Sequence, residues 1–130
     1  AGVRTDPAEA ARYVADTGVD ALAVAVGSSH AMTERSATLD DALIARLRDA
    51  VPVPLVLHGS SGVGDDGLRR AVAAGIAKVN IGTALGVAFT RAVREALAAA
   101  PGAADPRPYL ARGREAVAET VRHWCTVVSG

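Results

Sequence analysis

Short runs rich in apolar residues alternate with longer amphipathic segments along the 130-residue chain. Three short runs, over 21–26, 55–57 and 78–81, predict strands. The first is continuously apolar, which is typical of a strand buried on both faces of a parallel sheet. The amphipathic segments predict helices before, between and after the strands, in the order α-β-α-β-α-β-α-α.

Capping and breaking residues predict where these helices begin and end. Asp6 is expected to be the N-cap of the first helix, with Pro7 at its first position and Glu9 completing a capping box, and Gly18 is expected to end it. The other helices are predicted over 39–50, from the end of the 58–64 loop to about 74, over 83–99, and over 108–128 after an N-cap at Asp105.

The strand count favours a fragment of a larger fold. Three apolar parallel strands leave both edges of a sheet bare, and bare edges of this kind invite further pairing. The chain therefore looks like part of a closed α/β barrel whose remaining strands come from sequence elsewhere, so that residues 1–130 would be the second part of a longer polypeptide.

Composition narrows the class of protein. The 14 basic and 14 acidic residues balance, without a basic excess, so neither nucleic acid nor an anionic membrane is expected as a partner. The single cysteine, Cys125, cannot form an intramolecular disulfide and is expected to be a small buried side chain. No segment approaches the length of an apolar membrane span. These features predict a cytoplasmic protein.

Two histidines stand at or just beyond the ends of predicted strands. His30 follows the first strand by a few residues and His58 ends the second, so in a barrel both would lie on one rim. Neutral imidazole is a common zinc ligand, and a catalytic zinc site uses three protein ligands, so a third would have to come from elsewhere. The alternative is that each histidine only hydrogen-bonds loop backbone.

Small polar residues accompany the histidines. The loop HGSSG at 58–62 precedes a helix, and Asn80-Ile81-Gly82-Thr83 ends the third strand and opens the next helix. Both loops suit a phosphate group, and barrels commonly bind phosphate after their last two strands. Strand alternation would place Lys78 and Asn80 on one face, which leaves open a Schiff-base aldolase, although the two histidines would then have no role.

At these residues the chain resembles the class II, metal-dependent fructose-bisphosphate or tagatose-bisphosphate aldolases. The matching segments are Gly27-Ser28-Ser29-His30-Ala31, Leu57-His58-Gly59-Ser60-Ser61-Gly62 and Asn80-Ile81-Gly82-Thr83. The resemblance covers essentially the whole chain. It implies a (β/α)8 TIM barrel, with residues 1–130 forming the C-terminal half of a single domain and supplying its last three strands and their helices.

The resemblance also implies a site and a reaction. His30 and His58 would be two zinc ligands. The substrate would be bound by Ala31, Gly59, Ser60, Ser61, Asn80, Ile81, Gly82 and Thr83. Of these, two glycines and two hydroxyl residues, Gly59, Ser61, Gly82 and Thr83, would hold the phosphate of dihydroxyacetone phosphate, beside a monovalent cation (Na⁺ or K⁺). Asn80 would contact the ketose chain near its carbonyl. Zinc would polarise the ketone while a ketose 1,6-bisphosphate is cleaved to dihydroxyacetone phosphate and glyceraldehyde 3-phosphate.

Some family features differ or are missing. Ala31 stands where the family has glycine, and Ser28 where threonine is usual. The family's catalytic aspartate, third zinc histidine and proton-transferring glutamate match nothing in residues 1–130, so no catalytic residue is assigned here and the fragment alone is expected to be inactive. The remaining half of the barrel and a homo-oligomer are the expected partners.

Two further functions remain open beside the aldolase. One is a non-catalytic, phosphate-binding relative or partner subunit of the same fold. The other is a different phosphate-binding barrel that needs no metal, such as an isomerase or synthase of amino-acid biosynthesis. The sequence does not choose between fructose and tagatose bisphosphates.

Overall fold

The computed structural model describes residues 3–29 and 34–129. The predicted order of helices and strands is confirmed, with one short 3₁₀ helix added after the second strand. The elements are α1 (Pro7–Thr17), β1 (Leu22–Val24), α2 (Asp41–Ala50), β2 (Leu55–Leu57), η1 (Ser60–Gly62), α3 (Asp65–Ala74), β3 (Ile76–Val79), α4 (Thr83–Ala99) and α5 (Pro106–Ser129).

The strands form one parallel sheet in the order β1-β2-β3. The third strand begins at Ile76, two residues before the predicted start. Gly75 ends α3 and makes the turn alone, so Ile76 is already buried and pairs with Leu55. The backbone N–H of Asn80 still donates to the carbonyl of Leu57 at 2.9 Å, which carries the pairing to the edge of the sheet.

The helix ends follow the predicted capping residues closely. The carboxylate of Asp6 accepts hydrogen bonds from the backbone N–H groups of Ala8 and Glu9, and α1 ends at Gly18 as expected. The last helix begins at Pro106 rather than at 108. Asp105 caps it by accepting from the N–H of Arg107 at 3.0 Å, so Pro106 takes the first helical position, which needs no N–H partner.

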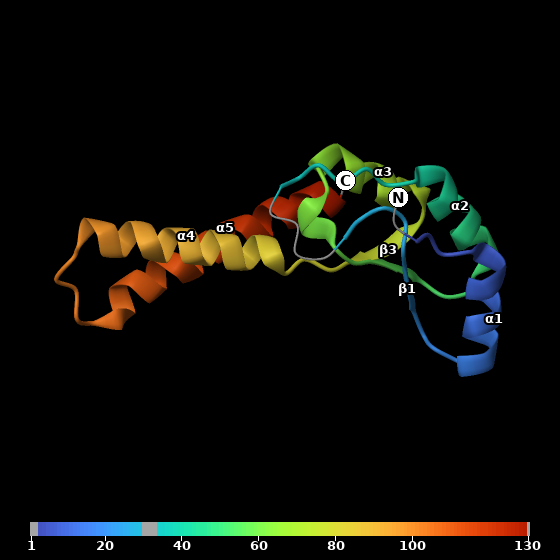
Figure 1. The fold of residues 1–130 in the computed structure, drawn as a ribbon, viewed down its shortest axis with the longest axis horizontal. Helices are drawn as coiled ribbons and strands as arrows, with labels where there is room; N and C mark the ends of the chain where they lie inside the picture. The colour runs from blue at the N-terminus through green and yellow to red at the C-terminus, as the bar shows by residue number, and fades with distance from the viewer. Residues whose placement is uncertain (1–2, 30–33, 130) are drawn as a thin grey trace.

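The hydrophobic core lies between the sheet and helices α1, α2 and α3, which pack on one side of it (Figure 1). Ile44 and Leu47 of α2 and Leu68 of α3 are fully buried against Leu55 and Leu57 of β2. The expectation that the first strand is buried on both faces is wrong for this chain. Ala23 at the centre of β1 is exposed, because these helices cover only the opposite face.

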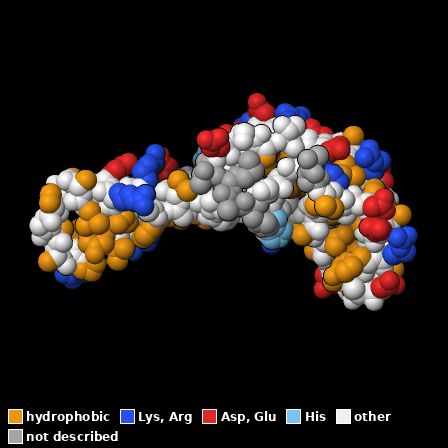
Figure 2. Space-filling view, viewed as in Figure 1, with side chains coloured by type: hydrophobic (Ala, Val, Ile, Leu, Met, Phe, Trp, Pro, Cys, Tyr) orange, Lys and Arg blue, Asp and Glu red, His pale blue; other side chains and the backbone are white. Residues whose placement is uncertain are grey.

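Helices α4 and α5 pack along each other and form an arm that projects from the sheet (Figure 1). Hydrophobic side chains gather near the far end of this α4–α5 arm (Figure 2). Among the apolar residues of the arm, Val87, Leu97, Leu110 and Val121 are exposed. Exposed apolar surface is typical of contacts with another chain or another part of the same chain. The homo-oligomer stays a prediction.

The C-terminal part of α5 returns to the core, where Trp124 and Val127 are buried. Cys125 is exposed, so its predicted burial is wrong. Neighbouring helical residues point about 100° apart, and Trp124 takes the inward position. None of the described helices combines the length and the apolar character that crossing a bilayer requires.

Candidate functional site

The loops that follow the three strands meet around one cavity of about 250 Å³. Every predicted site residue that the structure describes lines this cavity: His58, Gly59, Ser60, Ser61, Asn80, Ile81, Gly82 and Thr83. Ser29 also lines it and was not among the predicted residues, although its place directly before His30 could have indicated it. His30 and Ala31 lie outside the described residues.

His58 contacts Asn80, which in turn is hydrogen-bonded to Lys78. The side-chain nitrogen Nδ2 of Asn80 lies 3.1 Å from Nε2 of His58. The ammonium of Lys78 donates to Oδ1 of Asn80 at 2.8 Å. The predicted placement of Lys78 and Asn80 on one face is therefore confirmed. Lys78 is exposed in this chain, and its role as a Schiff-base lysine stays an alternative prediction.

The loop after β1 lies against the loop after β2. Gly59 has a left-handed backbone (φ +67°), and a Cβ there would lie 2.5 Å from the carbonyl oxygen of Ser29. The hydroxyl of Ser28 donates to the carbonyl of His58. These contacts bring the backbone directly before His30 to the residues that flank His58.

The second half of the cavity combines a helix start with serine hydroxyls. Gly82 and Thr83 line the cavity at the beginning of the 17-residue helix α4, so the positive end of the helix dipole lies there. The hydroxyl oxygen of Ser61 accepts from the N–H of Ala84 at 3.0 Å. Ser60 is fully buried and its hydroxyl donates to the carbonyl of Leu57. This arrangement suits an anion such as phosphate.

A second, more open cavity of about 380 Å³ lies on the other side of His58. Ala23, Val24 and Ala25 of the first strand segment line it, together with Ser28, Ser29 and His58. Ser29 and His58 border both cavities. One ligand could therefore place a charged end in the first cavity and a less polar part beside β1.

The donors in this part of the chain fit an incomplete metal site. Within 3–29 and 34–129, no three His, Cys, Asp or Glu side chains gather closely enough to hold a metal ion. His58 nevertheless borders the cavities with an imidazole, and the backbone preceding His30 contacts the same loop. Imidazole is a suitable zinc donor, and a full zinc site would need ligands from outside the described residues.

Comparison with known proteins identifies the family. The whole of residues 1–130 matches the model of the family described as fructose-bisphosphate aldolase class-II. The chain belongs to this family. The resemblance that the sequence analysis drew from the three loop motifs is thus confirmed for this member of the class II family.

The solved structures that are similar to the chain include three aldolases. The YdjI aldolase from Escherichia coli K12 is 38% identical with a TM-score of 0.85, over 96% of this chain and 46% of that one. A candidate fructose-1,6-biphosphate aldolase from Coccidioides immitis is 26% identical (TM-score 0.84), over 99% of this chain and 44% of that one. Fructose-bisphosphate aldolase from Campylobacter jejuni is 22% identical (TM-score 0.79), over 97% of this chain and 45% of that one. At this level of identity the similarity supports the fold alone. The chain thus spans less than half the length of these proteins.

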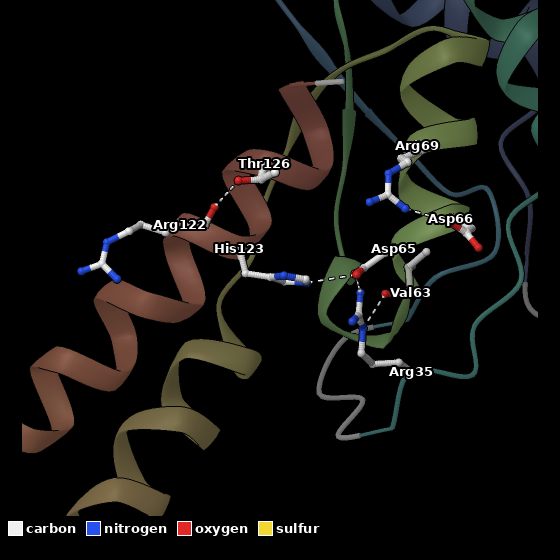
Figure 3. Close-up of polar contacts among 8 residues, drawn as sticks. All are labelled: Arg35, Val63, Asp65, Asp66, Arg69, Arg122, His123 and Thr126. Atoms are coloured by element: carbon white, nitrogen blue, oxygen red, sulfur yellow. Dashed lines mark hydrogen bonds and ion pairs between the residues drawn. The ribbon is translucent and has the colours of Figure 1, made fainter.

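In this member of the class II family, a polar cluster holds the C-terminal part of the loop in which His30 stands in the sequence. Asp65, at the start of α3, lies between Arg35 and His123 (Figure 3). Arg35 forms an ion pair with Asp65, donates to the carbonyl of Val63 at 2.9 Å, and places its guanidinium 4.6 Å from the ring centre of Trp124. His123 Nε2 lies 3.0 Å from Asp65 Oδ2. The cluster ties this loop and α5 to the segment that follows His58.

Asp65 makes the stability of this cluster depend on pH. Its ion pair with Arg35 lowers the pKa of the Asp65 carboxyl below 3.8; burial opposes the shift, and His123 adds to it. A lowered pKa in the folded state means that the stabilisation is present above about pH 3.8 and is lost as the pH falls through the folded-state value.

We expect Asp65→Asn to lower the free energy of unfolding by about 1 kcal/mol at pH 7, because Arg35 loses its charged partner. The difference from the unmodified protein should shrink below about pH 3.8, and urea unfolding at pH 7 and pH 3 measures it. Asp66→Asn is the matched control, since Asp66 is largely exposed in its pair with Arg69. An equal effect of Asp65→Asn at both pH values would contradict this account.

Proposed function

We propose that the protein containing this chain is a zinc-dependent aldolase. It cleaves a ketose 1,6-bisphosphate, of the fructose or tagatose type, to dihydroxyacetone phosphate and glyceraldehyde 3-phosphate. The observation that carries the proposal is the cavity lined by His58 and by two glycine- and hydroxyl-rich loops, in a member of the class II family. The chain would supply the last three strands of a (β/α)8 barrel, and the remaining half of the barrel would complete the site.

The phosphate would occupy the cavity between the loops after β2 and β3. Gly59, Ser61, Gly82 and Thr83 would hold it, as supported by the start of α4 and by the Ser61 hydroxyl beside that start. Ser60 and Ile81 would contribute backbone groups, and Ala31 would lie nearby. A monovalent cation (Na⁺ or K⁺) beside the phosphate is proposed from the family resemblance alone.

The reacting carbons would lie next to His58. His30 and His58 would hold the metal, and zinc when bound supplies a Lewis acid for the ketone oxygen. The amide of Asn80, 3.1 Å from the His58 ring, would contact the ketose chain near its carbonyl. The acid and base that move protons would come from the remaining half of the barrel.

Metal removal tests this proposal. We expect the purified whole protein to contain stoichiometric zinc and to lose more than about 99% of its cleavage activity after dialysis against a chelator, because the Lewis acid is removed. Added zinc should restore the activity. Triose phosphate release in a coupled assay and elemental analysis measure both quantities. Cleavage that resists the chelator and is trapped by borohydride at Lys78 would overturn the proposal in favour of Schiff-base chemistry.

The same experiment separates the remaining alternatives. A non-catalytic relative would bind the ketose bisphosphate without cleaving it, in the presence or absence of zinc. A metal-free phosphate-binding barrel would contain no zinc and would show no ketose cleavage. Either result would contradict the zinc aldolase.

A further inference from the structure

Hydrogen bonds at the edge of the sheet connect three side chains, Lys78, Asn80 and His58. Lys78 Nζ lies 2.8 Å from Asn80 Oδ1, and Asn80 Nδ2 lies 3.1 Å from His58 Nε2. The three residues come from two neighbouring strand segments, β2 and β3, whose pairing continues to Asn80. The backbone of the sheet therefore holds their relative positions.

The chemistry of Lys78 fixes the direction of this chain. A lysine ammonium has three N–H donors and no acceptor, so Asn80 must turn its oxygen towards Lys78. The NH₂ group of the same amide then faces His58. Because an NH₂ group only donates, Nε2 of His58 has to accept, and a ring nitrogen accepts only when it carries no hydrogen. In the neutral ring the hydrogen is consequently on Nδ1.

We propose that Lys78 is a positioning residue that sets the tautomer of His58 through the amide of Asn80. Without Lys78, the Asn80 amide could rotate by 180° and present its oxygen to His58, which would favour a hydrogen on Nε2 instead. The effect of Lys78 on the tautomer does not depend on the proposed function; only its consequence for metal binding rests on that function. If His58 is a metal ligand, Lys78 decides which ring nitrogen keeps a lone pair before the metal arrives.

The tautomer can be measured directly in the metal-free protein. Nitrogen-15 NMR of the whole, histidine-labelled protein, at a pH at which the imidazole rings are neutral, distinguishes a protonated from an unprotonated ring nitrogen. The His58 signals are assigned by their loss in His58→Gln. We expect Nε2 of His58 to be unprotonated and Nδ1 protonated in most molecules.

Two variants of Lys78 test the cause. Lys78→Met should lower the ratio of the Nδ1–H to the Nε2–H form by about fivefold, the factor that one ordinary hydrogen bond provides. Lys78→Arg keeps a cation that only donates, and should keep the ratio. Unchanged His123 signals verify that both variants are folded, because His123 lies on α5 and pairs with Asp65, away from Lys78.

Two results would overturn the inference: a His58 ring that carries its hydrogen on Nε2 in the unmodified protein, or a tautomer ratio that Lys78→Met leaves unchanged. The measurement uses neither zinc nor substrate. Its failure is therefore distinct from a failure of the proposed aldolase function, which the chelator experiment reports.

Discussion

Replacing His58 with alanine is expected to remove zinc from the whole protein and to lower its aldolase turnover by more than ~100-fold. His58 is the described histidine that borders the cavity, and it reaches both the phosphate side and the side next to β1. Loss of an outer-shell partner already costs a metal site about 10–100-fold, so loss of a ligand should cost at least as much. Elemental analysis of zinc and the triose phosphate assay measure the two effects.

The other described histidine supplies the matched control for this experiment. His123 lies on α5 and pairs with Asp65, and it does not line either cavity. His123→Gln should therefore keep both the zinc content and the turnover. The assignment of His58 as a ligand would be wrong if His58→Ala kept its zinc, or if both variants lost it to the same extent.

The local part of the site could be predicted because strand ends leave a short signature in the sequence. The apolar run at 55–57 stops at His58, and the run over 78–81, which contains Asn80, stops at Gly82 and Thr83. In a parallel sheet, consecutive strands end at the same edge, so two such stops imply one cluster of side chains. The cavity lined by His58 and Asn80 agrees with that prediction.

The polar cluster around Asp65 could not be predicted in the same way. Arg35 and Asp65 are 30 residues apart, and each is an ordinary residue of its own segment. Their contact depends on how the loop after β1 folds back over the start of α3, where Ala37 N–H donates to the carbonyl of Gly62. Strand and helix periodicity carries no information on such a long-range contact.

One face of the sheet is not covered by helices α1, α2 and α3, and this explains one error in the sequence interpretation. The apolar run at 21–26 predicts burial on both faces, yet Ala23 is exposed. Lys78 is also exposed, on β3 at the opposite edge of the sheet. In the proposed barrel this face would point inwards, so its small and polar residues would line the interior beside the site.

Substituting alanine for Gly59 is expected to lower the free energy of unfolding by about 2–5 kcal/mol. The left-handed backbone at φ +67° costs an alanine roughly 1–2 kcal/mol. The added Cβ would also lie 2.5 Å from the oxygen and 2.7 Å from the carbon of the Ser29 carbonyl, which are backbone atoms. The two loops would have to separate, at a further cost of about 1–3 kcal/mol. Urea unfolding measures the change.

Gly64→Ala separates this contact from the general effect of adding a methyl group to a loop glycine. Gly64 has φ −70°, and a Cβ there would meet no atom within 4 Å. We expect this variant to stay within about 0.5 kcal/mol of the unmodified protein. Because the loop that Gly59 contacts leads directly to His30, Gly59→Ala should also weaken zinc binding, whereas Gly64→Ala should not. Equal stability and equal zinc affinity in the two variants would show that the contact between Gly59 and Ser29 does not hold the site together.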